Sequence, residues 1–545
     1  MKNRVELPKK RVHKTPRILL ADAYTTGSNP FESEDAKNKS TYYLTFRRKL
    51  SDVNPELYKV GNNKIIAAGL QRILEKLFYK QITHEEIDKA KRFLANAKVT
   101  TQGFKEFYFP EHIWREVVDH YNGRPPIKIT AMPEGSVVYQ NEPVVIIESQ
   151  VKGMGILAAW FESKILHMWG VSERITQNEH WFAYLKEMVK TIEPDLDDSM
   201  IAFYASIMLH DFGDRAGITL EESEELGMAH LYTFGGTDTF SGAYQAFRNT
   251  DGDSTGLFSS VNALAHRNVQ AYEFEGDCYE AVYEASSDNE LISMVADCYD
   301  FEYAVENYLL PLALRSVSEG NGKVVVARPD SGNPLEQVLW TCRLAVKNGL
   351  YTERIINGKT WKFATTLHFI EGDGMTHKMM KKIINALMDE GFVPYSWGLF
   401  GVGGGLRNAL KRDNLSGKYA LCAVGDEDRG VVKYGEVGKT TLSGPFKVLR
   451  SAEALANKTT IVRPFEEGKN AMVEYYNGAR LEKPFGIGQD DDFLTIKNRI
   501  REQFDNMPLS LETKENANYP ASETILNDRI ELLDRYKNHG KEVVA

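Results

Sequence analysis

Residues 324–334 read VVVARPDSGNP, and this stretch decides the fold class. The apolar run Val324 to Ala327 predicts a short buried strand. Arg328 to Asn333 is polar and rich in turn-forming residues, and Pro334 is typical of the first turn of a helix, where its missing N–H needs no partner. A buried strand that passes through a polar loop into a helix is the unit from which parallel sheets are built.

The same unit recurs twice further along the chain. Residues 363–370 predict a strand that enters the loop Glu371-Gly-Asp-Gly374, and residues 395–400 predict a strand that enters Gly401-Val-Gly-Gly-Gly405. A helical pattern of apolar residues follows each loop. Successive units of this kind imply parallel strands with helical crossovers, so the loops after the strands gather at one end of the sheet and hold the chemistry.

The chain changes character on either side of this region. Before about residue 156 it is mixed, with an apolar stripe from Ile66 to Leu77 that predicts a helix and a β-rich stretch over 137–147. After about residue 420 it returns to β-like and then helical segments. The last part, 491–545, has the pattern of amphipathic helices joined by polar linkers, which predicts a helical extension rather than a catalytic element.

Composition narrows the class of protein. Hydrophobic residues make up 42% and charged residues 26% of 545 residues, which is ordinary for a globular protein. The net charge of −10 argues against nucleic-acid or membrane-surface binding, although a local basic pocket stays possible. The four cysteines show no CxxC spacing, so a zinc or other protein-held metal site is not expected. The basic N-terminus lacks the apolar run of a secretory signal, and no apolar stretch is long enough to span a bilayer, so we expect a cytoplasmic protein.

The glycine loop at 401–405 could bind phosphate through backbone N–H groups that no side chain shields. A dinucleotide-binding fingerprint would need a third glycine where Leu406 stands, so that interpretation is disfavoured. Residues 435–441 resemble a P-loop, but Lys433 occupies the position of its first glycine. A structural turn is the alternative for the glycine loop.

Two other loops carry charges suited to a phosphorylated sugar. Arg328 offers a rigid fork for phosphate beside Asp330, whose carboxylate could hold ribose hydroxyls. In the next strand–loop–helix unit, Gly372 provides a flexible backbone beside another carboxylate, that of Asp373. An internal ion pair is the alternative for each loop taken alone.

Three further segments carry candidate chemistry. His210 to Arg215 reads HDFGDR, and Phe212 could stack on a heteroaromatic ring. Asp238 lies in an acidic turn, where helix capping is the alternative role. His266 ends the stretch SVNALAH, and a lone histidine is more often structural than catalytic.

Taken together, these segments resemble the nicotinamide phosphoribosyltransferase family, a branch of the type II phosphoribosyltransferases. The resemblance runs from Asp22 to about Lys439. The matching segments are HDFGDR at 210–215, GGTDT at 235–239, SVNALAH at 260–266, ADCYD at 296–300, ARPDSGNP at 327–334, EGDG at 371–374 and FGVGGGL at 400–406.

The resemblance implies an α/β fold in which an irregular β/α barrel is flanked by a mixed α/β domain built from both terminal parts. The implied boundaries are 1–155 and 416–490 for the two parts of the mixed domain, 156–415 for the barrel and 491–545 for the extension. It also implies a homodimer with shared active sites, the substrates nicotinamide and phosphoribosyl pyrophosphate, Mg²⁺ bound with the phosphates, and ATP as a facultative co-substrate.

Residue roles follow from the same resemblance. Nicotinamide would lie between Phe212 and Tyr24 of the partner subunit, near Ser260 and Val261, with its amide donating to Asp238. The donor would be held by residues that fall into three groups: Arg215 and Arg328 for pyrophosphate, Asp330, Gly372 and Asp373 for ribose, and Gly403, Gly404 and Arg412 for the 5′-phosphate. Arg47, Lys418 and Lys433 would add phosphate contacts from the partner subunit.

His266 matches the histidine that ATP phosphorylates in that family, and Asp297 matches the carboxylate beside it. With Asp330 these are the expected catalytic residues. The residue before the histidine is Ala265, where the family carries glutamate.

Three other functions stand as alternatives. Nicotinate phosphoribosyltransferase would share the fold and donor, and Asp238 speaks against it because a carboxylate repels the carboxylate of nicotinate. A non-catalytic dimeric binding protein on the same scaffold is the second. An NAD-dependent oxidoreductase is the third, and the missing third glycine disfavours it.

Overall fold

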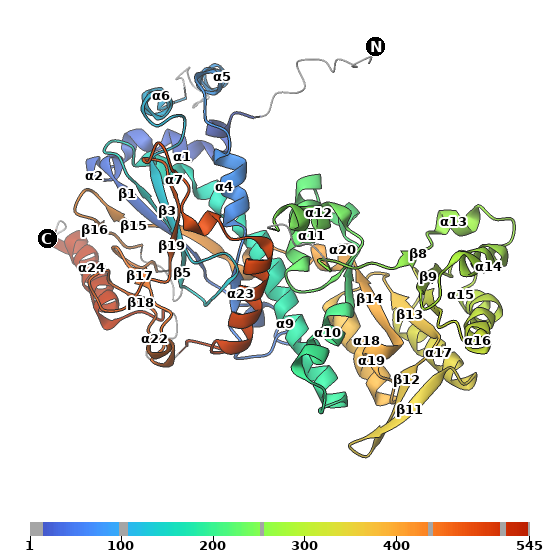
Figure 1. Cartoon of the computed structure of the whole chain (residues 1–545). Coiled ribbons are helices and arrows are strands. Elements are labelled where there is room, and N and C mark those ends of the chain that lie inside the picture. Colours follow the sequence, from blue (N-terminus) through green and yellow to red (C-terminus); the bar gives the residue numbers. More distant parts are fainter. Residues whose placement is uncertain (1–14, 97–106, 251–255, 434–439, 513–518, 543–545) are drawn as a thin grey trace, which may run out of the picture.

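The computed structural model describes residues 15–96, 107–250, 256–433, 440–512 and 519–542. The basic N-terminal run and the segment from Gly435 to Lys439 lie outside these residues. The chain forms two bodies that the long helix α9 (Met168–Ile192) joins, with a sheet domain on one side and a barrel on the other (Figure 1). No helix of the described residues is both long and apolar enough to cross a membrane.

The barrel is a ring of parallel strands. Its seven strands are β6 (Leu209–Asp211), β7 (Gly236–Thr237), β8 (Asn262–Ala263), β9 (Leu291–Val295), β10 (Val324–Arg328), β13 (Leu367–Glu371) and β14 (Gly398–Val402). They are hydrogen-bonded in the order β7-β6-β14-β13-β10-β9-β8. A parallel bridge between Gly236 of β7 and Ser259, just before β8, brings the two edges of the sheet together, so the sheet curls round on itself. The predicted irregular β/α barrel is therefore confirmed.

Helices cover the outside of this ring and bury its apolar face. They include α9, α10 (Asp198–Ile207), α14 (Glu275–Ala285), α16 (Leu310–Glu319), α17 (Pro334–Lys347) and α18 (His377–Asp389). The largest hydrophobic core joins strand residues such as Met294 and Phe369 to helix residues such as Leu312 and Ile383. Burial of this apolar surface is the main force that holds the ring closed.

The unit at 324–334 folds as predicted, with β10 entering α17 at Pro334. The other two strands start later than predicted. Phe363 and Ala364 end β12 (Lys359–Ala364), which forms a hairpin with β11 (Tyr351–Ile356), and the barrel strand begins at Leu367. Pro394 to Trp397 form the short helix α19, because proline favours a first helical turn, and the strand begins only at Gly398.

The flanking domain is built from both ends of the chain, as predicted. Its six-stranded sheet contains β1 (Ser40–Phe46), β3 (Ile127–Ala131), β5 (Pro143–Ser149), β15 (Gly417–Val424), β16 (Arg429–Gly430) and β19 (Val473–Asn477). β1 pairs antiparallel with β5 on one side and with β15 on the other. A strand that follows the barrel therefore lies beside one that precedes it, which fixes the two bodies to each other.

The predicted helix at 66–77 is shorter than its apolar stripe. Helix α4 spans Leu70–Phe78, whereas Ile66 lies in β2 (Ile65–Ala67) and pairs with β4 (Ser136–Val138). Gly69 separates the two elements in a left-handed conformation, with φ of 105°. Such a φ interrupts a helix, and glycine adopts it without strain.

The C-terminal extension is helical, but its first helix is not peripheral. Helix α23 (Phe493–Asn506) lies between the sheet domain and the barrel (Figure 1). Ile496 and Ile500 pack in a core shared with Val137 of β4 and Met228 of α11 (Leu220–Leu231). Polar contacts also reach both bodies: the side chain of Gln503 accepts from Val137 N–H at 2.9 Å, and Lys497 donates to the Leu231 carbonyl at 2.7 Å. Helix α24 (Glu523–Glu542) follows and buries Ile525 against the sheet domain.

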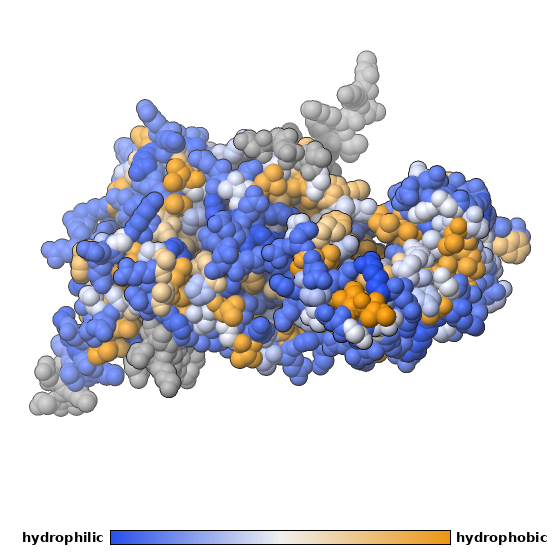
Figure 2. Space-filling model, turned by 60° about the horizontal axis from the view of Figure 1, so that its bottom comes forward, coloured by the Kyte–Doolittle hydropathy of each residue, from blue (hydrophilic) through white to orange (hydrophobic). Residues whose placement is uncertain are grey.

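The face drawn in Figure 2 is mostly hydrophilic, with apolar side chains in separate small patches. Scattered apolar residues are normal on protein surfaces.

Ile500→Ala should lower the free energy of unfolding by about 2–5 kcal/mol, because the truncation leaves a cavity in the core between the two bodies. Urea denaturation followed by circular dichroism measures the loss. Glu502→Ala on the exposed face of α23 is the matched control and should change stability by less than about 0.5 kcal/mol. Equal midpoints for the two variants would show that α23 does not hold the bodies together.

Candidate active site

The carboxyl ends of the barrel strands meet at one mouth, because all seven strands are parallel. Predicted site residues lie on, or within a few residues after, the ends of all seven of these strands. These residues are Phe212 and Arg215 after β6, Asp238 after β7, His266 after β8, Asp297 after β9, Arg328 and Asp330 at the end of β10, Gly372 and Asp373 after β13, and Gly403 and Gly404 after β14.

His266, Asp297 and Asp330 come together from three strand ends. His266 Nε2 lies 3.1 Å from Asp297 Oδ1, and its Nδ1 lies 3.8 Å from Asp330 Oδ2. Asp297 is buried, and its second oxygen accepts from Asp330 N–H at 3.1 Å and Ser331 Oγ at 2.6 Å. A carboxylate only accepts hydrogen bonds, so the contact with Asp297 places a proton on His266 Nε2.

Phe212 lies across the neighbouring strand β14. Its N–H donates to the Val402 carbonyl at 2.7 Å. A side chain at Gly401 would place its Cβ only 2.1 Å from the Phe212 ring, so glycine is required at that position. The aromatic ring is half-buried in the wall of the mouth, which leaves part of it for a planar ligand.

Asp238 follows β7, the strand next to β6. Its N–H donates to the Asp211 carbonyl at 2.9 Å, which ties it to the residue before Phe212. Its carboxylate is exposed in this chain and accepts a hydrogen bond from Ser260 Oγ. Val261 follows Ser260 directly. The structure therefore places Phe212, Asp238, Ser260 and Val261 on one side of the mouth.

Glu371 and Asp373 form a second acidic group, near the pair of His266 and Asp297. Asp373 N–H donates to Glu371 Oε1 at 3.0 Å, and Gly372 lies between them. Burial raises the pKa of Glu371 to about 8, and the charges of Asp373 and Asp330 act in the same direction. Glu371 was not among the predicted site residues, and its place in the sequence EGDG was the only available signal. Arg328 lies on the same side of the mouth. Its Nε is buried and has no hydrogen-bond partner among the described residues.

The glycine loop differs in detail from the prediction. Gly401 and Val402 belong to β14, and Gly403 precedes the four-residue helix α20 (Gly404–Arg407). The backbone of Gly403 lies against the Phe212 carbonyl, since a Cβ there would be 3.3 Å from that oxygen. Gly403 and Gly404 therefore border the same mouth.

The remaining predicted residues lie apart from these. Arg412 is exposed on α21 (Arg412–Leu415) and pairs with Asp413 at 2.8 Å. Tyr24 is exposed on α1 (Ala23–Gly27) in the sheet domain. Arg215, by contrast, belongs to the residues after β6 and is exposed on the short turn after Phe212.

Arg47, Lys418 and Lys433 form a cationic cluster on the sheet domain. Lys418 of β15 is opposite Thr45 of β1, and Arg47 donates to Ser416 Oγ at 3.0 Å. Burial and, to a smaller extent, the like charges of Arg47 and Lys433 together lower the pKa of Lys418 to about 8. These residues belong to the sheet domain, not to the strand ends of the barrel.

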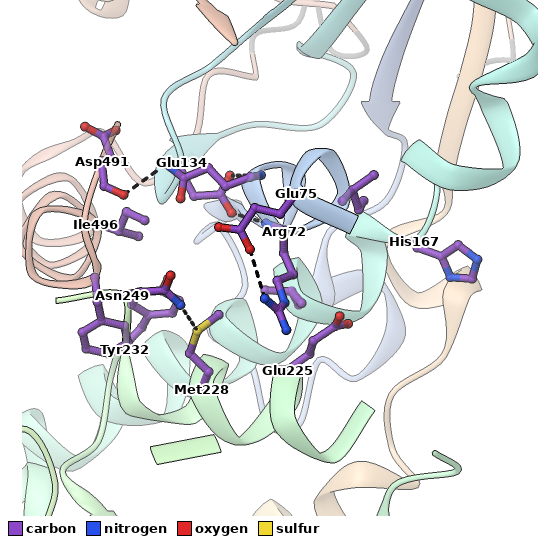
Figure 3. A pocket seen from close by; sticks show the side chains of 15 residues that line it. Arg72, Glu75, Glu134, His167, Glu225, Met228, Tyr232, Asn249, Asp491 and Ile496 are labelled. Atoms are coloured by element: carbon purple, nitrogen blue, oxygen red, sulfur yellow. Dashed lines mark hydrogen bonds and ion pairs between the residues drawn. The ribbon is translucent and has the colours of Figure 1, made fainter. Parts of the chain in front are cut away.

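A cavity of about 50 Å³ lies at the seam between the two bodies (Figure 3). Arg72 and Glu75 of α4 form an ion pair of 3.0 Å on its wall, and Glu225, Tyr232 and Asp491 line other parts of it. None of the predicted site residues lines this cavity. The candidate site is therefore the barrel mouth and not this internal space.

Two family models match the chain. The model of the nicotinate phosphoribosyltransferase family matches residues 207–435, and the model of the nicotinamide phosphoribosyltransferase N-terminal domain matches residues 18–129. Together they cover more than half of the chain. The nicotinamide phosphoribosyltransferase of Xanthomonas campestris pv. campestris is 29% identical over 356 residues, 65% of this chain and 71% of that protein. The protein of the same name from Acinetobacter baylyi is 23% identical over 442 residues, 73% and 79% of the two chains.

The chain belongs to the nicotinamide phosphoribosyltransferase family. Solved structures agree on the fold. Human nicotinic acid phosphoribosyltransferase superposes with a TM-score of 0.54 at 13% identity, covering 94% of this chain and 100% of that one. Nicotinate-nucleotide pyrophosphorylase from Pyrococcus furiosus superposes with a TM-score of 0.52 at 13% identity, covering 93% and 98%.

The cationic cluster of this phosphoribosyltransferase should bind inorganic pyrophosphate more weakly as the pH rises through about 8. Lys418 is charged below its pKa and neutral above it, so the attraction for an anion is lost on the alkaline side. Titration calorimetry between pH 7 and pH 9 measures the affinity.

Lys418→Arg is the matched control, because arginine stays charged over this range. Its affinity should lack the part of the pH dependence that belongs to the lysine. Identical pH profiles for both proteins would show that Lys418 does not cause the pH dependence of pyrophosphate binding.

Proposed function

We propose that this chain transfers the ribose-5-phosphate group of phosphoribosyl pyrophosphate to nicotinamide. The ring nitrogen of nicotinamide forms a bond to the anomeric carbon, the bond from that carbon to pyrophosphate breaks, and nicotinamide mononucleotide and pyrophosphate are released, a step of NAD salvage. The observation that carries the proposal is the barrel mouth, where the loops with Asp238 and Phe212, the glycine loop and the acidic loop follow four neighbouring strands, β7, β6, β14 and β13.

The base would bind on the Phe212 side. The pyridine ring stacks on Phe212, and the carboxamide NH₂ donates to Asp238. Ser260 already donates to this carboxylate and so helps to keep it in place. Nicotinate would bring a second negative charge against Asp238, which costs binding energy in a partly enclosed site.

The donor would bind across the other strand ends. Asp330 and Asp373 accept hydrogen bonds from the ribose hydroxyls. Arg215 and Arg328 contact the pyrophosphate, and the buried Nε of Arg328 offers an N–H that lacks a partner among the described residues. Backbone N–H groups of Gly403 and Gly404 hold the 5′-phosphate.

The chemical step is a displacement at a carbon that develops positive charge. The residues of the mouth contribute mainly by aligning the two substrates and by stabilising the departing pyrophosphate. In the part of the chain that the structure describes, no group of three or more His, Cys, Asp or Glu side chains is placed to hold a metal ion. Mg²⁺ would therefore bind chiefly through phosphate oxygens of the donor and supply further charge neutralisation when present.

The site would be completed by a second copy of the chain in a homodimer. Tyr24 is 64% exposed, a high value for a tyrosine, and would cover the open face of nicotinamide in the partner's mouth. Arg412 and the cluster of Arg47, Lys418 and Lys433 would reach the partner's phosphates. This use of cations reconciles a chain of net charge −10 with a polyanionic substrate.

His266 would couple ATP to the reaction. Its Nδ1 takes the γ-phosphoryl group, the bond to the β-phosphate oxygen breaks, and ADP leaves; water later hydrolyses the phosphohistidine to phosphate. Asp297 holds the ring in the required tautomer at 3.1 Å. We also propose a cytoplasmic location, since none of the four cysteines forms a disulfide.

Product formation from phosphoribosyl pyrophosphate and Mg²⁺ tests the function, with nicotinamide and nicotinate offered separately and with or without ATP. Mass spectrometry should detect nicotinamide mononucleotide, and the yield should rise with ATP. Nicotinate mononucleotide alone would favour a nicotinate phosphoribosyltransferase. No product from either base would favour a binding protein.

Asp238→Asn should lower kcat/KM for nicotinamide about 10- to 100-fold, the effect of losing a hydrogen bond to a charged group. It should also reduce the preference for nicotinamide over nicotinate, because the repulsive charge is gone. Steady-state kinetics with both bases measure the ratio. Asp214→Asn, which removes an exposed carboxylate on the turn after Phe212, should keep the parental preference. Unchanged discrimination in Asp238→Asn would contradict the assigned role.

His266→Ala should abolish ATP hydrolysis while weak transferase activity remains, because the barrel residues that bind both substrates are intact. Release of ADP and of pyrophosphate, measured in parallel, separates the two reactions. Gln270→Ala, an exposed change on the helix that His266 begins, is the control and should hydrolyse ATP normally. ATP turnover at the parental rate in His266→Ala would refute the phosphohistidine.

A further inference from the structure

A buried charge cluster lies beneath the barrel mouth. Asp211 is the last residue of β6 and forms ion pairs with two arginines. Arg407 Nη2 lies 3.3 Å from Asp211 Oδ2, and Arg174 Nη2 lies 3.6 Å from Asp211 Oδ1. The three side chains are only 1–2% exposed. Arg174 comes from α9 and Arg407 from α20, so the cluster ties a long barrel helix to the segment after the glycine loop.

The cluster carries more positive than negative charge. Among the described residues, the ion pairs of both guanidinium groups are with Asp211. His230, whose Nδ1 is 3.3 Å from Arg174, is neutral and adds no charge of either sign, since burial lowers its pKa to about 3. Nε and Nη1 of both arginines are buried and make no hydrogen bond within the described residues. One positive charge is therefore left without a counterion in a region of low dielectric, which is costly unless another anion comes close.

This charge lies directly behind the two loops that face the donor. A Cβ at Gly213 would be 2.2 Å from Arg407 Nε, so the guanidinium is packed against the backbone that follows Phe212. Arg407 N–H donates to the Gly403 carbonyl at 3.2 Å, which places the arginine one turn from the glycine pair. The Gly403 backbone in turn contacts the Phe212 carbonyl.

We infer that Arg407, seated with Arg174 on Asp211, is a positioning residue for the phosphate donor, and that the 5′-phosphate supplies the anion the cluster lacks. The inference rests on the proposed function. Arg407 need not touch the donor. The buried positive charge of Arg407 acts through the low-dielectric protein interior and favours a dianion at the glycine loop. Its planar guanidinium group also holds the backbone at Gly213 in place.

Three variants separate the effect of the extra positive charge on donor binding from the effect of the shape of the Arg407 side chain. Arg407→Leu removes the extra charge and leaves Asp211 paired with Arg174. Arg407→Lys keeps the charge but loses the fork. Arg174→Met removes the same charge from the opposite side and leaves Arg407 in place. Each variant keeps at least one cation on Asp211, so none leaves an isolated buried carboxylate.

Calorimetry measures the affinity of each protein for phosphoribosyl pyrophosphate, and thermal melts with and without inorganic phosphate measure ligand-induced stabilisation. Arg407→Leu and Arg174→Met should each lose donor affinity by about tenfold, with KM for nicotinamide unchanged. They should also lose most of the phosphate-induced rise in Tm. Arg407→Lys should stay within about threefold of wild type, because one charge is the larger contribution.

A purely structural cluster gives another pattern. Lower Tm with unchanged donor affinity in Arg407→Leu and Arg174→Met would overturn the inference, and so would an Arg407→Lys protein as impaired as Arg407→Leu. If Arg407→Leu fails to fold, the other two variants still decide between these results. Wild-type protein that binds no donor would overturn the proposed function itself, and this inference with it.

Discussion

The parallel direction of the barrel strands is the constraint on which the site depends. Because every strand of the ring runs the same way, residues far apart in the chain are delivered to one edge: His266, Asp297 and Asp330 meet from β8, β9 and β10. The ring closes at Gly236 and Ser259, which brings Asp238 and Ser260 into contact. A slip at that bridge would separate the base side of the mouth from its hydrogen-bond partner.

The second body supplies stability and charge. β1 and β15 pair across the whole barrel insertion, and α23 fills the seam with Ile496 and Ile500. The same sheet domain carries Tyr24 and the cationic cluster. In the function proposed above, the barrel would orient the substrates, and Tyr24 and the cationic cluster of a partner subunit would enclose them.

Local patterns predicted the barrel units well, because a strand, a loop and a helix are encoded within a few residues of each other. VVVARPDSGNP folds as predicted, and the candidate loops after the strands converge. Features that depend on distant residues were not predictable: the buried pairing of Arg174 and Arg407 with Asp211, the raised pKa of Glu371, and the place of α23 between the bodies. Ile66 fits a helical stripe, and only Gly69 and the pairing of β2 with β4 show why it is a strand residue.

The most direct test of the central claim is an experimental structure of the chain with nicotinamide mononucleotide and pyrophosphate bound. We expect the pyridine ring on Phe212 with its amide at Asp238, and Tyr24 of the partner subunit over the ring. The ribose should lie at Asp330 and Asp373, and the 5′-phosphate at Gly403 and Gly404. Product bound away from the strand ends, or a carboxamide turned from Asp238 in a mouth that one chain completes alone, would contradict it.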